Sequence, residues 1–194
     1  MMFRFFRRNP SGHSIARLYG TIVAQARAAP FYLICGVPDT VNGRFEMVVL
    51  HTVLVLRRLE SEPDPIRRLG QGLFDRFCQD MDGSLREMGI GDLGVPTKMR
   101  KIGEAFYGRQ AAYGAALADP DQDILVGALN RNVFGAPTGT DLGATRLAAY
   151  VRAVASALAG QDGEAMSRAQ LTFPDPEATM VADPMIADPM GAAR

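Results

Sequence analysis

Apolar side chains recur along most of this chain at intervals of three and four residues, the spacing of one face of an α-helix. Between the apolar segments stand glycines and prolines of the kind that end helices. The expected helices cover residues 14–29, 42–60, 64–88, 96–117, 122–133 and 140–158. The pattern therefore predicts an all-α fold, a single-domain bundle of about six to eight helices with a central helical hairpin.

The hairpin, residues 73–109, is the segment around which the rest of the chain is organised. Its first helix carries an apolar stripe of Leu73, Phe77, Met81, Leu85 and Met88. Glycines at 89, 91 and 94 then break this helix, and Pro96 starts a second one. Because the connection leaves no room for a strand, the two helices are expected to lie side by side, joined by a turn whose glycines supply unusual backbone angles.

The helix expected over residues 42–60 is apolar almost all round, which places it at the centre of the bundle. His51 lies within this helix, where a hydrogen-bonded core histidine is favoured over a ligand or a proton carrier. Residues 31–38 are expected to form one turn of helix rather than an extended buried piece, since no strand is available to pair with them. A further short helix is expected within residues 163–171.

Capping residues indicate where the helices start. Asp39 or Asn42 is expected to cap the central helix, and Asp64 followed by Pro65 is expected to begin the next one. The same reasoning starts a helix at the Asp119–Gln122 segment and places Thr140 as the cap of the last long helix. At the other end, Pro30 is expected to close the first helix.

Composition narrows the class of protein without identifying it. The 194 residues are 47% hydrophobic, enough for one core, and 21 basic residues balance 21 acidic ones, so there is no bulk attraction to DNA. Cys35 and Cys78 are too few for a disulfide framework and are expected to be reduced core residues. The apolar run 47–56 is far shorter than the roughly 20 residues that span a bilayer.

Three parts are expected along the chain. Residues 1–12 form a basic and aromatic N-terminal arm, for which a frayed terminus is favoured over docking on an anionic membrane. Residues 13–172 form the helical domain, and residues 173–194, with their repeated ADPM, form a disordered Pro-rich tail. The N-terminus lacks a long apolar region, which favours a cytoplasmic bacterial protein.

Motifs of catalysis and cofactor binding fit this chain poorly. The run GIGDLG at 89–94 has the letters of a dinucleotide fingerprint, but an amphipathic helix precedes it where that motif requires a strand. Asp75 and Asp82 share a helix face without a histidine nearby, so solvated carboxylates are favoured over a metal site. Neither of the two histidines lies in a nucleophile pattern. We expect no enzyme, no metal and no cofactor.

A resemblance to a known family adds to this interpretation. The segments DMDGSLREMGIGDL, VPTKM and FYGRQAAY, together with FYLICGVPDTVNGRFEMVVLHTVLVLRRL upstream, resemble the ubiquinol–cytochrome c chaperone family, which assembles the cytochrome bc1 complex. The resemblance covers roughly residues 14–160 and implies an all-helical protein that is not an enzyme and acts at the face of an energy-transducing membrane. It implies binding of newly made cytochrome b or its nascent chain, and leaves open a second small assembly subunit, the ribosome and peripheral contact with the inner membrane.

The resemblance also directs attention to particular side chains. Arg86 and Arg109 are the best candidates for reaching a partner, because arginine suits interface recognition, whereas Leu85 and Met99 are expected in the core. Gly91 and Pro96 are expected to shape the loop. The predicted partner-binding residues are Asp82, Arg86, Glu87, Asp92, Lys101, Tyr107 and Arg109.

A second hypothesis is a helical receptor that holds an apolar ligand, such as a quinone or a lipid, inside the bundle. This hypothesis predicts an internal cavity of a few hundred cubic ångströms, which a chaperone does not need.

Overall fold

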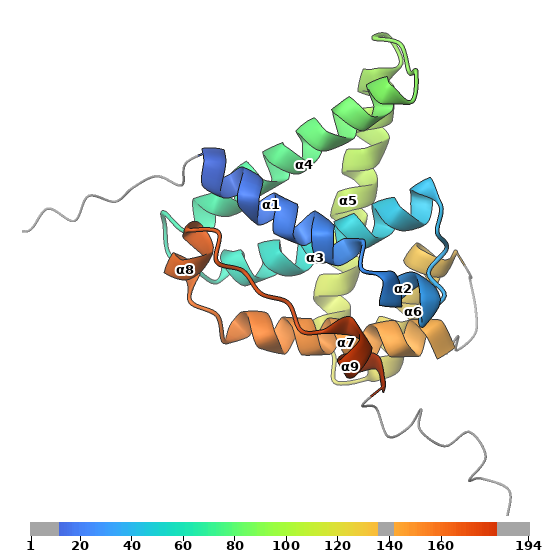
Figure 1. Ribbon diagram of the computed structural model, residues 1–194, viewed down its shortest axis with the longest axis vertical. Coiled ribbons are helices and arrows are strands. Elements are labelled where there is room, and N and C mark those ends of the chain that lie inside the picture. The colour runs from blue at the N-terminus through green and yellow to red at the C-terminus, as the bar shows by residue number, and fades with distance from the viewer. Residues whose placement is uncertain (1–11, 136–141, 182–194) are drawn as a thin grey trace, which may run out of the picture.

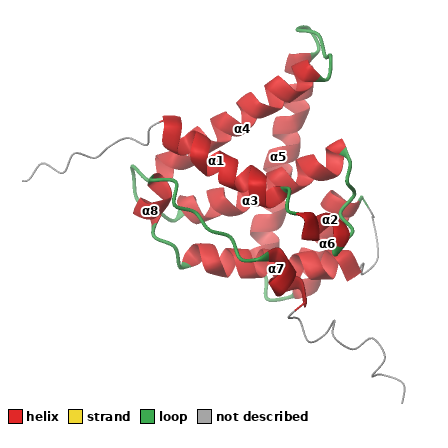
Figure 2. Cartoon of the chain, viewed as in Figure 1, coloured by secondary structure: helices red, strands yellow, loops and turns green. Residues whose placement is uncertain are grey.

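The computed structural model describes residues 12–135 and 142–181. Helices and loops make up this part of the chain, and it contains no strand (Figure 2). The all-α prediction is confirmed. The helices are α1 (Gly12–Ala26), α2 (Ala29–Leu33), α3 (Val41–Glu60), α4 (Arg67–Glu87), α5 (Val95–Ala118), α6 (Gln122–Leu129), the π-helical turn η1 (Asn130–Phe134), α7 (Leu142–Ala159), α8 (Gly163–Ser167) and α9 (Pro176–Val181).

Helix α3 is the centre of the fold, as its apolar sequence predicts. Every residue from 46 to 56 is buried, so three full turns are covered on all sides. The covering elements are α1, α4, α5, α7 and η1, all of which contact α3. Because a helix that is apolar on every face cannot expose any of them to water without a cost in free energy, the other long helices must surround it.

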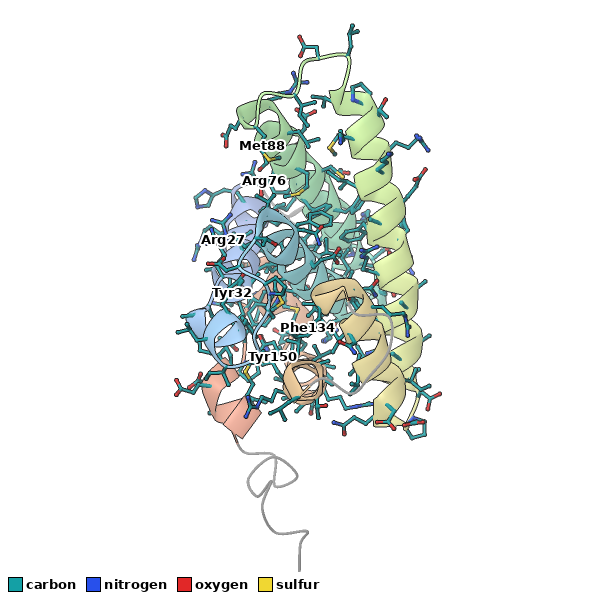
Figure 3. The ribbon with its side chains drawn as sticks, turned by 90° about the vertical axis from the view of Figure 1, so that its right-hand side faces the viewer. Arg27, Tyr32, Arg76, Met88, Phe134 and Tyr150 are labelled. Carbon is teal, nitrogen blue, oxygen red and sulfur yellow. The ribbon has the colours of Figure 1, made fainter. Side chains whose placement is uncertain are left out.

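The α4–α5 hairpin is also confirmed, and it reaches beyond the rest of the described chain. In Figure 1 the two helices converge on the loop at 88–94, at one extreme of the molecule, and diverge toward their other ends. Their diverging ends rest on α3, which contacts both of them. Figure 3 places Met88 near the loop, far from Tyr150 on α7. The hairpin is therefore held at its base and free at its tip.

Several helix starts differ from the capping predictions. Thr40, rather than Asp39 or Asn42, caps α3, and its Oγ1 accepts a hydrogen bond of 3.1 Å from the Gly43 N–H. Asp39 instead pairs with Arg44 at 2.6 Å. A side chain at Gly43 would collide with the Pro38 carbonyl, so only glycine lets the cap close.

Helix α4 begins at Arg67, later than the expected start at Asp64 and Pro65, which lie in a turn. Pro30 opens α2 rather than merely closing α1, which ends at Ala26. Asp121 does cap α6, as expected, by accepting from the Asp123 N–H at 2.9 Å. The expected cap at Thr140 lies outside the described residues. The short helix within 163–171 is confirmed as α8. The turn of helix expected at 31–38 is confirmed in part, because α2 covers Ala29–Leu33 and residues 36–38 are not helical.

His51 is a core residue, as predicted. Its Nδ1 lies 2.8 Å from the Met47 carbonyl, and its Nε2 lies 2.9 Å from the Tyr150 hydroxyl, which also accepts from Gln25 Nε2 at 2.9 Å. Since a carbonyl only accepts, the proton sits on Nδ1, and Nε2 accepts from the tyrosine. Burial lowers the pKa of His51 to about 4, although the hydrogen bond to Met47 opposes this shift.

The C-terminal segment corrects the predicted tail. Residues 168–175 cross the bundle beside α1 and α7, Phe173 packs its ring 5.5 Å from that of His51, and α9 follows (Figure 1). Met180 on α9 is fully buried, and its sulfur lies 3.3 Å from that of Cys35. Disorder from residue 173 was therefore wrong for 173–181, because Phe173 and Met180 supply apolar surface for burial. Residues 182–194, like 1–11 of the predicted arm, lie outside the described residues, and Gly12 belongs to α1.

Phe77→Ala should lower the free energy of unfolding by about 3–5 kcal/mol. Phe77 is fully buried between Phe45 and Phe106, so its removal leaves a cavity in the core. Urea denaturation measures the loss. Leu93→Ala, at an exposed position, is the control and should remain close to the parent chain. An unchanged Phe77→Ala variant would place Phe77 outside the core.

The stability of the chain should fall as the pH drops from about 6.5 to about 4. The unfolded chain takes up a proton on His51 near its ordinary pKa of 6.5, whereas the folded chain resists protonation until about 4. The neutral His51 contributes up to about 3 kcal/mol to the free energy of unfolding, and this contribution is fully present above pH 6.5. Comparing the denaturation curves with those of His51→Gln separates the effect of the histidine from that of the carboxylates. Parallel pH profiles for the two chains would contradict the assignment.

Candidate functional site

An aromatic cluster fixes the base of the hairpin. The Phe77 and Phe106 rings lie 5.0 Å apart, and Phe74 lies 4.9 Å from Phe106 and 5.6 Å from Tyr107. These contacts join α4 to α5, and Phe45 brings in α3 at 6.4 Å from Phe77. Edge and tilted ring contacts of this kind are both apolar and directional. They set the direction in which the hairpin leaves the bundle.

Arg109 is part of this foundation, and its contact with a partner stays a prediction. Its Nη2 and Nε donate to both oxygens of Glu46 at 2.6 and 3.0 Å, a bidentate pair between α5 and α3. Glu46 is only 2% exposed, and its hydrogen bond raises the pKa of Arg109. A buried carboxylate needs such a partner. Sequence reasoning missed Glu46, because a lone acid in an apolar helix does not reveal its partner.

The loop at the other end of the hairpin has a defined shape. Helix α4 ends with two nested hydrogen bonds. The Ile90 N–H donates to the Leu85 carbonyl at 3.1 Å, and the Gly89 N–H donates to the Arg86 carbonyl at 2.9 Å. Gly89 has a φ of 82°, the left-handed conformation that this ending requires and glycine adopts without strain. Gly94 N–H then donates to the Gly91 carbonyl at 2.8 Å as α5 begins.

Side chains tie this loop to α4. Arg86 Nε donates to Asp82 at 2.7 Å, and Arg86 Nη1 pairs with Asp92 in the loop. Both hydrogen bonds raise the pKa of Arg86. Leu85 and Val95, on either side of the loop in sequence, are buried but do not belong to the main core cluster. Arg86 therefore shapes the loop, and its predicted contact with a partner stays a prediction.

The fixed loop exposes apolar side chains. Leu93 is 97% exposed and Met88 is 55% exposed. Met88 was predicted to face inward with the α4 stripe, but it is the residue at which α4 ends, and the helix there has passed beyond the bundle. We call residues 88–94 the tip. Leu93 was missed, although an apolar residue inside a glycine-rich loop is a signal that could have found it.

Unpaired charges flank the tip. Glu87, Lys98 and Lys101 are exposed, and among the described residues none of them has an oppositely charged side chain within 4 Å. By contrast Arg100 on the same helix pairs with Glu104 at 2.6 Å. Such free charges are suited to orienting a partner.

A groove lies at the base of the hairpin, between α3, α4 and α5. Its volume is about 430 Å³, and Phe74, Phe106 and Tyr107 form part of its wall. Tyr107 is 59% exposed. Of the predicted partner-binding residues, the structure joins Asp82, Arg86 and Asp92 beside the tip, with Glu87 next to Arg86 in sequence. Tyr107 lies several helical turns away on α5. Lys101 lies on α5 between the tip and Tyr107, and most of the Arg109 side chain is buried.

The receptor hypothesis finds little support in the pockets of this structure. Besides the groove described above, a second pocket of about 440 Å³ lies between α3 and α7. Both have exposed ionic side chains in their walls, Arg67 and Glu60 in the first and Arg57 in the second, whereas a quinone or lipid site is enclosed and apolar. Among the described residues, no group of three His, Cys, Asp or Glu side chains could hold a metal ion. No helix there has the length and apolar character needed to cross a membrane.

Comparisons with known proteins agree on one family. Residues 33–173 match the model of the family described as ubiquinol-cytochrome C chaperone. The chain is 27% identical over 148 residues to the ubiquinol-cytochrome-c reductase complex assembly factor 1 of Xenopus laevis, covering 76% of this chain and 74% of that protein. The counterpart from Mus musculus is 25% identical, again over 76% of this chain, and this region spans half of that longer protein.

A solved structure is also similar. The crystal structure of the Cbp3 homolog from Brucella abortus is 39% identical, with a TM-score of 0.80, over 92% of this chain and 99% of that one. At this identity the likeness extends to the family as well as to the fold.

Arg109→Ala should lower the free energy of unfolding by about 3 kcal/mol, because it leaves Glu46 buried without its cation. Chemical denaturation measures the loss. Adding Glu46→Gln should recover part of it, since a neutral amide costs less to bury than a lone carboxylate. Arg86→Ala, which removes only exposed pairs, is the matched control and should change stability little. If Arg109→Ala were as stable as Arg86→Ala, the Glu46–Arg109 pair would not support the fold.

Proposed function

Because the chain belongs to the ubiquinol–cytochrome c chaperone family, which assists assembly of ubiquinol–cytochrome c reductase, we propose that it holds newly made cytochrome b on the tip of the α4–α5 hairpin. Leu93 and Met88 contact apolar segments of the client in this proposal, and Glu87, Lys98 and Lys101 orient it. Arg86, Asp82 and Asp92 serve by fixing the loop. Holding the client requires no chemical step, so the chain acts without catalysis.

The exposure of Leu93 is the observation that carries the proposal. A large apolar side chain that is 97% exposed gains the most from being covered by another apolar surface. The hydrogen bonds of the Gly89 and Ile90 amides to the end of α4, and the two carboxylates around Arg86, hold the loop before any partner arrives. Little further ordering of the loop is then needed on binding, which favours affinity.

The client is suited to such a surface. A cytochrome b that has not met its neighbouring subunits presents apolar surface, which a chaperone must cover and later release. A small protruding contact allows both, because it buries less area than a permanent interface. We place this event in the cytoplasm, at the surface of the inner membrane where cytochrome b is inserted, with the chain in peripheral contact.

Leu93→Asp should weaken binding of cytochrome b by about tenfold or more and reduce mature bc1 complex, while the melting temperature stays unchanged. The charge falls on a fully exposed side chain, so folding is not affected, but a carboxylate cannot enter an apolar contact. The test is recovery of cytochrome b with the tagged chain from cells, together with the haem b spectrum of their membranes.

Leu33→Asp is the matched control, because Leu33 is 83% exposed on α2, away from the hairpin. This variant should retain both binding and bc1 content. Normal recovery of cytochrome b with Leu93→Asp, or equal losses in the two variants, would show that the tip does not hold the client.

A further inference from the structure

The groove between α3, α4 and α5 is a second surface that the folded chain leaves uncovered. Its floor is lined by the buried side chains of Leu56 and Leu59 of α3 and Phe106 of α5, and the half-buried Phe74 of α4 supplies apolar wall. Tyr107 stands at its edge, with its ring 5.6 Å from Phe74 and 6.1 Å from Phe106. An exposed tyrosine supported by two phenylalanines is typical of interface anchors, since it offers apolar area with little rotamer freedom to lose.

The side chains along the α4 edge of the groove are incompletely paired. Arg67 and Arg68 are exposed and share one carboxylate, that of Asp64, at 3.1 and 3.7 Å. On the facing edge Glu60 accepts a hydrogen bond of 2.9 Å from the neutral amide of Gln110. The α4 edge thus has two guanidinium groups for one carboxylate and can accept a second one.

We propose that this groove docks an amphipathic α-helix of a partner protein, with its apolar face on Tyr107 and Phe74 and a carboxylate beside that face pairing with Arg67 and Arg68. The volume of about 430 Å³ holds two or three large side chains, as successive turns of one helix present them. The groove is distinct from the tip, and this inference does not rest on the proposed client.

A helix is the form of partner that these walls admit. All three walls are helices, whose backbone groups are already hydrogen-bonded within each helix. An extended segment would find no strand edge here to pair with and would bring unpaired backbone groups against apolar walls. A helix satisfies its own backbone and presents only side chains.

The absence of tryptophan from the sequence makes the groove directly observable. In the full-length Tyr107→Trp variant, the introduced indole is the single tryptophan and reports whether the groove is filled. The probes are two synthetic amphipathic helices of 18 residues (about five turns) with identical leucine faces, one flanked by glutamates and the other by glutamines. Each is titrated against this variant while the emission maximum is followed.

The glutamate-flanked helix should shift the emission to shorter wavelength and bind about fivefold tighter than the glutamine-flanked helix. With Arg67→Glu and Arg68→Glu added, this preference should disappear, and a lysine-flanked helix should become the tightest. Arg57 is an exposed arginine in the pocket between α3 and α7. Its substitution Arg57→Glu is the control and should leave the preference for the glutamate-flanked helix intact.

Equal affinities for the two flanks, or no shift with either helix, would overturn the proposal. So would a shift that depends on protein concentration alone, which would show a second copy of this chain in the groove, or saturation by a quinone analogue. Loss of cytochrome b binding in Leu93→Asp is measured separately, so either proposal can fail while the other stands.

Discussion

The burial of α3 on every side is the constraint on which the rest of the structure depends. A helix with residues 46–56 wholly covered needs neighbours all round, and α1, α4, α5, α7 and η1 supply them. Two polar groups within that stretch then select specific partners. Glu46 requires the guanidinium of Arg109 on α5, and His51 requires the hydroxyl of Tyr150 on α7. Apolar burial thus gathers the helices, and these polar pairs fix where two of them lie.

The hairpin follows from this arrangement. The Glu46–Arg109 pair and the aromatic cluster hold the base of α4 and α5 against α3. Beyond α3 the two helices continue, and Leu85 and Val95, which flank the loop, are buried outside the main core cluster. A structure of this kind presents Leu93 at a fixed position away from the bulk of the protein. Binding at the protruding tip is compatible with a large client, such as the newly made cytochrome b of our proposal.

Periodicity was sufficient to predict the helices, the hairpin and the central place of α3, because each depends on residues close together in sequence. Prediction failed where distant residues decide the outcome. Arg109 resembled a free interface arginine until its partner, 63 positions away, was known. The predicted disordered tail likewise contains Met180, which is buried where α9 packs on α7 and next to Cys35. Asp82, Arg86 and Asp92 were predicted to bind a partner, which stays a prediction, and the pattern did not reveal that Arg86 pairs with both carboxylates.

The central claim is that the tip of the hairpin covers apolar surface of cytochrome b. Amide hydrogen exchange of the full chain, alone and in complex with detergent-solubilised cytochrome b, tests this claim most directly. We expect slower exchange across residues 88–98 in the complex, including the Gly89 and Ile90 amides, and no change in α2. Protection of α2 or α7 with an unchanged tip would contradict the account.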